Sequence, residues 1–306
     1  MAFSRKLYHC QKCNNGTKME LGGLLCHNRV KHPCDLKDAV APEEWAELRK
    51  PVVFDDEHVA LVVKPQGIET IKFQKTDVML GVAPRAAEKG VRMSVPRLLH
   101  RLDFATGGIM VAGKTHVATT IVSEHFRERR VQKRYRALIV GKPAEAEGTV
   151  EAPLDGKPSL TRYKVVDSVT AAPGVYTVDL WPSTGYRHQL RRHMAHLECP
   201  ILGDPKYMTH HSRKPYQGKP GPMCLWALEL SFPHPAKEGE KVSACIEEPE
   251  LYECIRTALA ASQNPMDDPV VAASPSPHND VPQKPPKGGQ TAGAGAAAGG
   301  GAGAEG

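Results

Sequence analysis

The sequence lacks a long hydrophobic run, since no apolar stretch approaches the roughly 20 residues that a membrane-spanning helix needs. The segment from Met1 to Cys10 is too short and too polar to be a secretory signal. No periodic repeat is visible. We therefore expect a soluble, intracellular protein that contacts no membrane, and the sequence leaves cytoplasm, nucleus and organelle open.

Acidic residues are in the minority, with 34 Asp and Glu against 40 Lys and Arg. Residues 264–306 account for −2 of the overall net charge of +6, so the rest of the chain carries +8. A cationic body suits a polyanionic partner such as RNA, although many basic proteins have no nucleic-acid role.

Composition divides the 306 residues into four regions, and the length is sufficient for a substantial hydrophobic core. Residues 1–35 are rich in Cys and His and form a candidate zinc knuckle. Residues 36–50 contain a short helical linker that has Pro42 near its first turn. Residues 51–255 are rich in strand patterns. Residues 262–306 are dominated by Pro, Ala and Gly and are expected to be disordered, because they cannot bury enough apolar surface.

The strand patterns indicate a fold of the α+β class with a mixed, mostly antiparallel central sheet and flanking helices and loops. Alternating or continuous apolar residues predict strands at 52–54, 59–63, 109–112, 135–141, 162–166, 175–181 and 226–232. The first two of these strands read as a hairpin. Helical spacing predicts helices at 115–129 and 188–197.

The most informative segment runs from His100 to Gly108, where Asp103 follows Arg101 and precedes a Thr-Gly-Gly turn. Alone, Arg101 and Asp103 would be read as an ordinary ion pair. Five further motifs accompany this segment in order: Val62 to Gly67, Lys133 to Leu138, Gly185 to His193, Pro200 to Tyr207, and Leu225 to Ala227 with His234-Pro235.

Together these motifs, spread over residues 52–250, resemble the RluA family of RNA pseudouridine synthases. The resemblance covers about two thirds of the chain and implies the pseudouridine synthase fold for residues 51–255. It also implies a reaction in which the N1–C1′ bond of an RNA uridine breaks, the uracil rotates, and C5 rejoins the sugar. No redox step is involved, so we expect no cofactor for catalysis.

The resemblance places three catalytic residues at Asp103, Tyr135 and Arg191. Asp103 must be ionised to act, either as a nucleophile at C1′ or as a base at C2′, and the sequence leaves both roles open. Arg191 is expected to pair with Asp103, while Arg192 on the same helix points elsewhere. The Tyr135 ring can stack on the detached base, and its hydroxyl can transfer a proton.

The substrate is expected to be an RNA, rRNA or tRNA, bound by a monomer. A dense basic run from Arg127 to Arg136 can track the RNA backbone, although such runs are usually solvated surface. The residues expected to bind the substrate RNA are His100, Arg101, Thr106, Lys133, Arg134, Arg187, His188 and Gln189.

Two departures from the family pattern keep other functions open. The family usually has Ser where this chain has Gly107, and the change to glycine would loosen the turn. The family usually has Arg where this chain has Tyr186. A catalytically weak or inactive RNA-binding protein on the same scaffold is therefore the alternative. A glycosidase-like hydrolase is a weaker one, because such enzymes use two carboxylates and no clear second acid is visible.

A structural zinc ion is the one metal that the sequence suggests. Cys10 and Cys13 form a Cys-x-x-Cys pair, and Cys26 and Cys34 can complete a tetrahedral site. His27 or His32 are substitutes. Four protein ligands would leave no open position, so the zinc would be structural.

Overall fold

The computed structural model describes residues 7–9, 18–20, 43, 46, 49–82, 92–167, 174–209 and 221–261. Two short strands near the amino terminus, β1 (Leu7–His9) and β2 (Lys18–Glu20), pair antiparallel. In the expected linker helix, Glu43, Ala46 and Arg49 are described and have helical backbone. Residues 262–306 lie outside the described residues, so the disordered tail stays a prediction.

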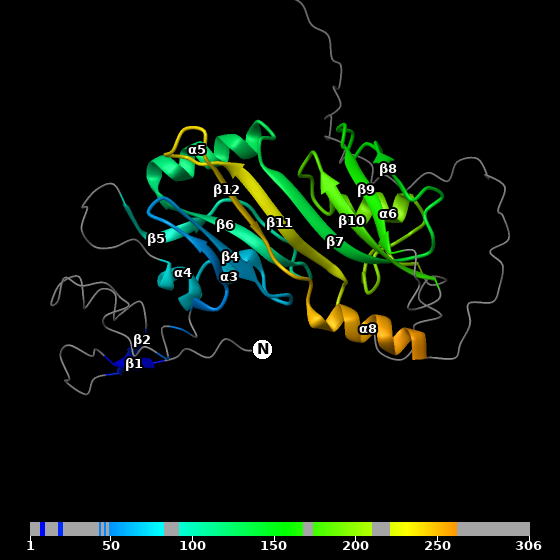
Figure 1. Cartoon of the computed structure of the whole chain (residues 1–306), viewed down its shortest axis with the longest axis horizontal. Helices are drawn as coiled ribbons and strands as arrows, with labels where there is room; N and C mark the ends of the chain where they lie inside the picture. Colours follow the sequence, from blue (N-terminus) through cyan, green and yellow to red (C-terminus); the bar gives the residue numbers. More distant parts are fainter. Residues whose placement is uncertain are drawn as a thin grey trace, which may run out of the picture. The chain divides into compact units, whose positions relative to one another are not determined.

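Ten strands of the described chain form a single twisted sheet (Figure 1). Every strand pair is antiparallel except β6 with β11, which is parallel. The predicted α+β class with a mixed, mostly antiparallel sheet is therefore confirmed. In spatial order the strands are β3 (Val52–Asp55), β4 (Val59–Lys64), β6 (Gly107–Thr115), β11 (Leu225–Pro233), β7 (Gln132–Val140), β10 (Val175–Pro182), β9 (Thr161–Asp167) and β8 (Glu147–Val150), while β5 (Arg92–Leu98) pairs with β6 and β12 (Lys241–Cys245) with β11.

Short helices connect or cover these strands: α3 (Thr70–Phe73), α4 (Asp77–Gly81), α5 (His116–Arg127), α6 (Gln189–His196) and α8 (Glu250–Ala261). None of the described helices is long and apolar enough to cross a membrane. The sequence predicts α5, α6 and seven of the strands. It did not indicate β5, β8, β12 or the helices α3, α4 and α8, which are short or have weak periodicity.

Strand β11 differs from the strict alternation that the sequence predicts. A register shift between Ala227 and Glu229 marks a bulge, so Ala227 and Leu228 are both buried. In the sequence Trp226 alternates in step with Leu228, Leu230 and Phe232, yet Trp226 is only half-buried whereas the other three are buried. Beyond the bulge the predicted alternation returns.

Two glycines allow β6 and β11 to approach each other near Asp103. Gly107 pairs with Trp226 and Gly108 pairs with Ala227. A Cβ on Gly107 would lie 2.2 Å from Cζ3 of Trp226, and one on Gly108 would lie 2.2 Å from the Ala227 carbonyl oxygen. The φ angle of Gly108 is +117°, which only glycine adopts readily. Gly107 therefore begins a buried strand and makes room for an indole ring; the expectation that it loosens a turn was wrong.

The core has several apolar clusters, and Tyr135 lies where two of them meet. One cluster joins β7, β9 and β10 to α6, and it includes Leu190 and Met194. Another joins β4 and β6 to α3 and α4, and it includes Phe73 and Met79. Tyr135 packs against both. The fold thus places the predicted catalytic tyrosine at the centre of the sheet.

Candidate active site

Asp103 lies between β5 and β6 and lines a hollow of about 290 Å³. Lys133 and Tyr135 of β7 and Arg191 of α6 line the same hollow. The three residues that the sequence predicts to be catalytic therefore meet in one place, although they are far apart in the chain. Among the described residues that line this hollow, Asp103 is the one carboxylate.

Arg191 joins Asp103 to a second, buried carboxylate. Its Nη1 lies 3.2 Å from Oδ2 of Asp103, and its Nε and Nη2 donate to the two oxygens of Asp204 at 2.7 and 2.8 Å. The Asp204 side chain is completely buried and also accepts from the backbone N–H groups of Lys206 and Tyr207. These contacts fix the plane of the guanidinium, so that one edge remains for Asp103.

Asp204 was not anticipated as a site residue, although it belongs to the Pro200 to Tyr207 motif. Burial tends to raise the pKa of this carboxyl, but hydrogen bonds from Arg191 and the backbone outweigh burial, so the pKa is lowered. Asp204 is therefore ionised at neutral pH and acts as the anchor of Arg191.

His188 approaches Asp103 from the start of α6. Its Nε2 lies 3.8 Å from Oδ2 of Asp103, and its Nδ1 lies 3.0 Å from the hydroxyl of Tyr207. Burial lowers the pKa of His188; the charge of Asp103 opposes this, whereas nearby Arg191, Arg187 and Lys206 add to it. When Tyr207 donates to Nδ1, the neutral ring carries its proton on Nε2, the nitrogen nearer Asp103.

Burial shifts the pKa of both β7 residues that face the hollow, Tyr135 and Lys133. Burial raises the pKa of Tyr135, and the negative charge of Asp103 raises it further. The phenol is therefore protonated at neutral pH. Burial lowers the pKa of Lys133, whose Nζ lies 3.5 Å from the carbonyl oxygen of Thr184.

Lys64, at the end of β4, adds a positive charge that the sequence did not single out. Its side chain is fully buried, and its ammonium donates to the carbonyl oxygens of Pro65 and Ile68, each at 2.9 Å. Burial lowers the pKa of Lys64 to about 8, and the charge of Asp103 opposes this shift. The only sequence signal for Lys64 is its place in the Val62 to Gly67 motif.

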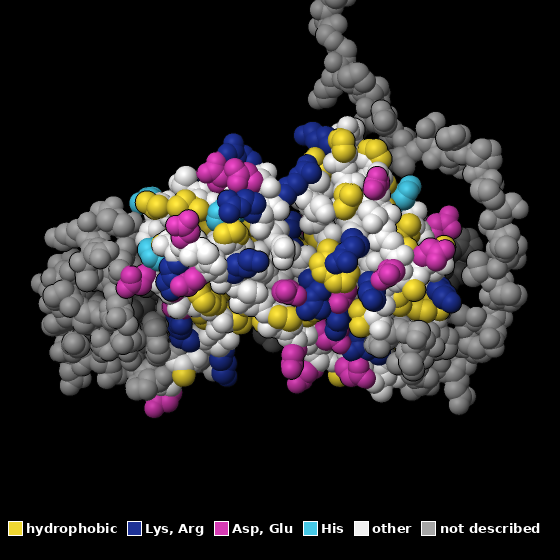
Figure 2. Space-filling view, turned by 45° about the horizontal axis from the view of Figure 1, so that its top comes forward, with side chains coloured by type: hydrophobic (Ala, Val, Ile, Leu, Met, Phe, Trp, Pro, Cys, Tyr) yellow, Lys and Arg dark blue, Asp and Glu magenta, His cyan; other side chains and the backbone are white. Residues whose placement is uncertain are grey.

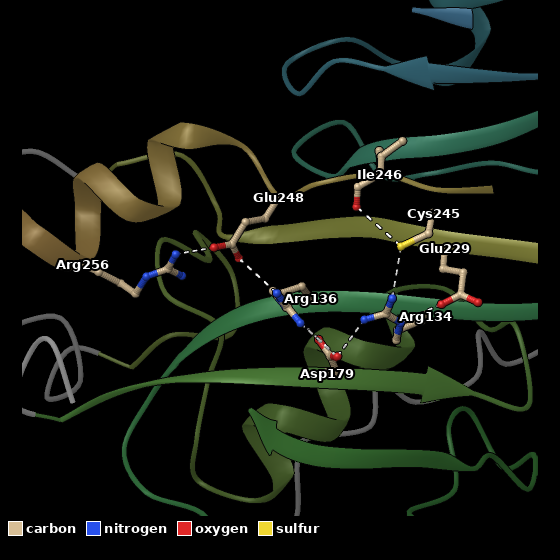
Figure 3. Close-up of polar contacts among 8 residues, drawn as sticks. All are labelled: Arg134, Arg136, Asp179, Glu229, Cys245, Ile246, Glu248 and Arg256. Atoms are coloured by element: carbon tan, nitrogen blue, oxygen red, sulfur yellow. Dashed lines mark hydrogen bonds and ion pairs between the residues drawn. The ribbon is translucent and has the colours of Figure 1, made fainter. Parts of the chain in front are cut away.

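Arg134, expected to bind RNA, is instead engaged on the other side of β7 (Figure 3). It donates to Glu229 at 2.8 Å, to Asp179 at 3.0 Å and to the Cys245 thiol at 3.2 Å. Successive strand residues face opposite sides of a sheet, so Arg134 points away when Lys133 and Tyr135 face the hollow. Its position therefore does not support the predicted RNA contact.

His100 and Gln189, also expected to bind RNA, line the hollow but make contacts within the protein. Nε2 of His100 accepts from the backbone N–H of Val111 at 3.2 Å, and burial together with the charge of Lys133 lowers its pKa to about 3. The Gln189 amide donates to the carbonyl of Leu160 and accepts from the hydroxyl of Thr184. Both residues hold the walls of the hollow, and their placement does not favour a direct RNA contact.

The remaining expected RNA-binding residues line the hollow or its rim. Thr106 is buried in the wall, and its hydroxyl has no hydrogen-bond partner in the described part of the chain. Arg101 and Arg187 are exposed and line a second, larger hollow of about 1100 Å³ that adjoins the first. Figure 2 shows one face of the described chain hollowed between the part with α5 and the part with β8 to β10, with Lys and Arg side chains along the hollow.

The expected zinc ligands Cys10, Cys13, Cys26 and Cys34 lie outside the described residues. Within the described ranges, no group of three or more His, Cys, Asp or Glu side chains is arranged to hold a metal ion. The zinc site therefore stays a prediction.

Comparison with known proteins points to one family. The sequence model of the family described as RNA pseudouridylate synthase matches residues 58–196, a range that includes Asp103, Tyr135 and Arg191. The chain is 34% identical over 202 residues to the dual-specificity RNA pseudouridine synthase RluA of Escherichia coli strain K12, covering 60% of this chain and 87% of that protein. The corresponding Vibrio parahaemolyticus protein is 33% identical over 201 residues, covering 60% and 78%.

Solved structures agree with the sequence matches. Human RNA pseudouridylate synthase domain containing 4 is similar with a TM-score of 0.56 and 25% identity, over 71% of this chain and 96% of that chain. Human RNA pseudouridylate synthase domain containing 1 gives a TM-score of 0.52 and 27% identity, over 65% and 83%. With the Asp103 site on the expected scaffold, the chain belongs to the RluA family of RNA pseudouridine synthases, which are isomerases.

Proposed function

We propose that this protein isomerises specific uridines of an RNA chain and that Asp103 is its essential carboxylate. The observation that carries the proposal is the position of Asp103, the one carboxylate among the described residues of the 290 Å³ hollow, 3.2 Å from the Arg191 guanidinium. A hollow of this size suits a single base taken out of its stack rather than a duplex. The expected substrate is rRNA or tRNA, bound by a monomer.

The charged groups support the chemistry that an ionised Asp103 requires. Arg191 stabilises the carboxylate, and the buried ammonium of Lys64 adds positive charge nearby. Asp103 can then attack C1′ or take the C2′ proton, and both roles remain open. Tyr135 offers a ring for stacking on the detached uracil and a neutral hydroxyl that can relay the C5 proton.

The alternative of an inactive RNA-binding protein has less support. Its motives were Gly107, Tyr186 and the amino-terminal cysteines, and the first of them is weakened because the Trp226 ring occupies the space that a side chain at position 107 would need. The departure thus has a packing reason. A two-carboxylate hydrolase is disfavoured too, because Asp204 is enclosed by Arg191 and two backbone N–H groups.

The test uses the purified full-length protein and RNA from cells that lack its gene. We expect wild-type protein to form pseudouridine at defined sites, and Asp103→Asn to reduce the rate by about 10²- to 10⁴-fold, the range for a positioned acid or base. Sequencing-based pseudouridine mapping of the treated RNA provides the measurement. RNA bound without any new pseudouridine would favour the inactive alternative.

A matched control is available one residue along α6. Arg192 pairs with Asp155 at 3.1 Å, just as Arg191 pairs with Asp103, but the Asp155 side chain is 73% exposed. Asp155→Asn makes the same chemical change at the surface and should leave the rate unchanged. Equal losses in both variants would show that the effect of Asp103→Asn is not specific to the site.

A further inference from the structure

The residue after Asp103 is an exposed aromatic side chain. Phe104 is 58% exposed and lines the hollow of about 1100 Å³ that adjoins the active site. Single exposed apolar side chains are common and need no explanation by themselves. Phe104 differs because hydrogen bonds fix its backbone and because arginine side chains line the same hollow.

Hydrogen bonds fasten the Asp103 segment to the loop that precedes α3. The backbone N–H of Gly67 donates to the Phe104 carbonyl at 2.9 Å, and the Gln66 amide donates to the Ala105 carbonyl at 2.8 Å. Thr70 exchanges two hydrogen bonds with the Leu102 backbone, at 2.9 and 3.1 Å. The attachment point of the Phe104 ring is therefore held on both sides, at a fixed place relative to Asp103.

The hollow around Phe104 combines apolar and cationic side chains. Ile71 of α3 is 68% exposed and lines the same hollow. The hollow is also lined by the guanidinium groups of Arg97, Arg101 and Arg187, none of which forms an ion pair with an acidic residue of the described ranges. Its acidic lining residue away from the active site, Glu69, pairs with Lys72 at 3.2 Å.

The two hollows adjoin and share part of their walls. Both are lined by Asp103, His188 and Arg191, and both include Gly185 and Tyr186. A nucleotide chain whose target base enters the smaller hollow would therefore place an adjacent nucleotide in the larger one. An aromatic face beside unpaired arginines is the surface that binds single-stranded nucleic acid by stacking and phosphate contacts.

We propose that Phe104 is a stacking platform for the base next to the target uridine, with the phosphates of that nucleotide held by Arg97, Arg101 and Arg187. This inference depends on the proposed function, since it assigns a role to the nucleotide that flanks the reacting one. The flanking base must be unstacked from its own helix, and a purine should be favoured because its larger ring system covers more of the phenyl face.

The experiment is a double-mutant cycle between Phe104 and the RNA. Short RNAs carry the uridine that mapping identifies with wild-type protein, and each adjacent base is replaced in turn by an abasic residue. With wild-type protein, one replacement should lower kcat/KM by about 10- to 100-fold, the usual worth of one base–aromatic stack. Phe104→Ala should cause a similar loss on the intact RNA and no further loss on the abasic RNA. Phe104→Trp should keep the wild-type pattern.

Two controls separate stacking from other effects. Val117→Ala removes another exposed apolar side chain, 62% exposed on α5 outside both hollows, and should change neither kcat/KM nor the abasic penalty. Thermal unfolding should be the same for Phe104→Ala and wild type. An abasic penalty of equal size in wild type and Phe104→Ala overturns the platform while leaving the isomerase intact. Wild-type protein that forms no pseudouridine overturns both.

Discussion

The two sides of strand β7 carry charged residues that behave differently. On one side, Lys133 and Tyr135 face the hollow that contains Asp103. On the other, Arg134 and Arg136 share Asp179, and Arg136 also lies 3.9 Å from Glu248 (Figure 3). The four residues are consecutive in the chain, so strand alternation alone sends them to two environments.

The difference lies in how many guanidinium groups surround the carboxylate on each side. Behind β7, the Asp179 carboxylate accepts from two guanidinium groups, and Glu229, Glu248 and Arg256 complete the network. In front of β7, the Asp103 carboxylate has one guanidinium at 3.2 Å and Nε2 of His188 at 3.8 Å, and it otherwise faces a hollow. Behind β7 every carboxylate of the network lies against a guanidinium, although Oε2 of Glu248 and Nη1 of Arg256 are buried without a hydrogen-bond partner among the described residues. Asp103 instead has one side open to a hollow, which makes it available for chemistry.

Substituting one residue on each side of β7 tests this contrast most strongly. Tyr135→Phe removes only the hydroxyl that faces the hollow, so the isomerisation rate should fall by about 10²- to 10⁴-fold with little change in stability. Arg134→Gln should leave the rate unchanged at 25 °C and lower the free energy of unfolding by about 1 to 3 kcal/mol, because Asp179 and Glu229 lose hydrogen bonds. Single-turnover rates and urea unfolding measure the two effects.

The contrast would be contradicted if the isomerisation rates of both variants fell in proportion to their free energies of unfolding. Because the Arg134 side chain is 21% exposed, water can replace part of its interactions, and the lower end of the range is the firmer expectation. Arg134→Gln with an unchanged free energy of unfolding would show that the network behind β7 contributes nothing to the sheet.

A second pair of variants compares the two carboxylates that hold arginines. Asp204→Asn and Asp179→Asn each remove one acid from arginines that keep a second one, Asp103 for Arg191 and Glu229 for Arg134, and each should lower the free energy of unfolding by about 1 to 3 kcal/mol. Only Asp204→Asn should also slow isomerisation, by about 10²-fold, because Arg191 loses the anchor that fixes it beside Asp103. Rates measured at a temperature where both variants are folded give the comparison.

The Asp204 variant has an outcome that a purely structural role would not produce. If Asp204 acts through Arg191, kcat should fall while KM for the RNA changes little, because the anchor does not touch the substrate. Equal changes of kcat in the two variants would mean that buried charge, rather than the position of Arg191, controls the rate.

Most of the fold and the centre of the site could be predicted because they depend on local pattern and on motifs. Apolar periodicity located β4, β6, β7, β10 and both longer central helices, α5 and α6. The helical spacing that separates Arg191 from Arg192 also placed one arginine inward and the other at the surface. These features are encoded by neighbours in the chain.

The remaining features depend on contacts that the local pattern does not contain. The basic run from Arg127 to Arg136 looks like one RNA-binding surface, yet Arg134 and Arg136 are neutralised by Asp179, more than 40 positions later. Glycine is needed at position 107 because Trp226 of the neighbouring parallel strand lies against it. The role of Asp204 depends on its contact with the Arg191 guanidinium of α6. The charge and size of each side chain could be read from the sequence, but its contact partners in the fold could not.

An expected effect on stability alone concerns Lys64, the buried cation near Asp103 that donates only to carbonyl oxygens in the described part of the chain. The folded-state pKa of Lys64 is about 8, below its ordinary value of 10.5. Between these pH values the unfolded chain binds a proton that the folded chain lacks, so the free energy of unfolding should rise with pH. Relative to Lys64→Met, we expect a rise on the order of 2 kcal/mol from pH 8 to pH 10.5.

Urea unfolding of both proteins across this range measures the rise, and Asp103→Asn sharpens it. The Asp103 charge opposes the lowering of the Lys64 pKa, so its removal should lower that pKa further and start the rise at a lower pH. Parallel curves for wild type and Lys64→Met would mean that Lys64 keeps its proton in the folded state throughout. The buried cation in front of β7 would then keep its charge, as the arginines behind β7 do. The two sides would differ only in the geometry of their charged groups.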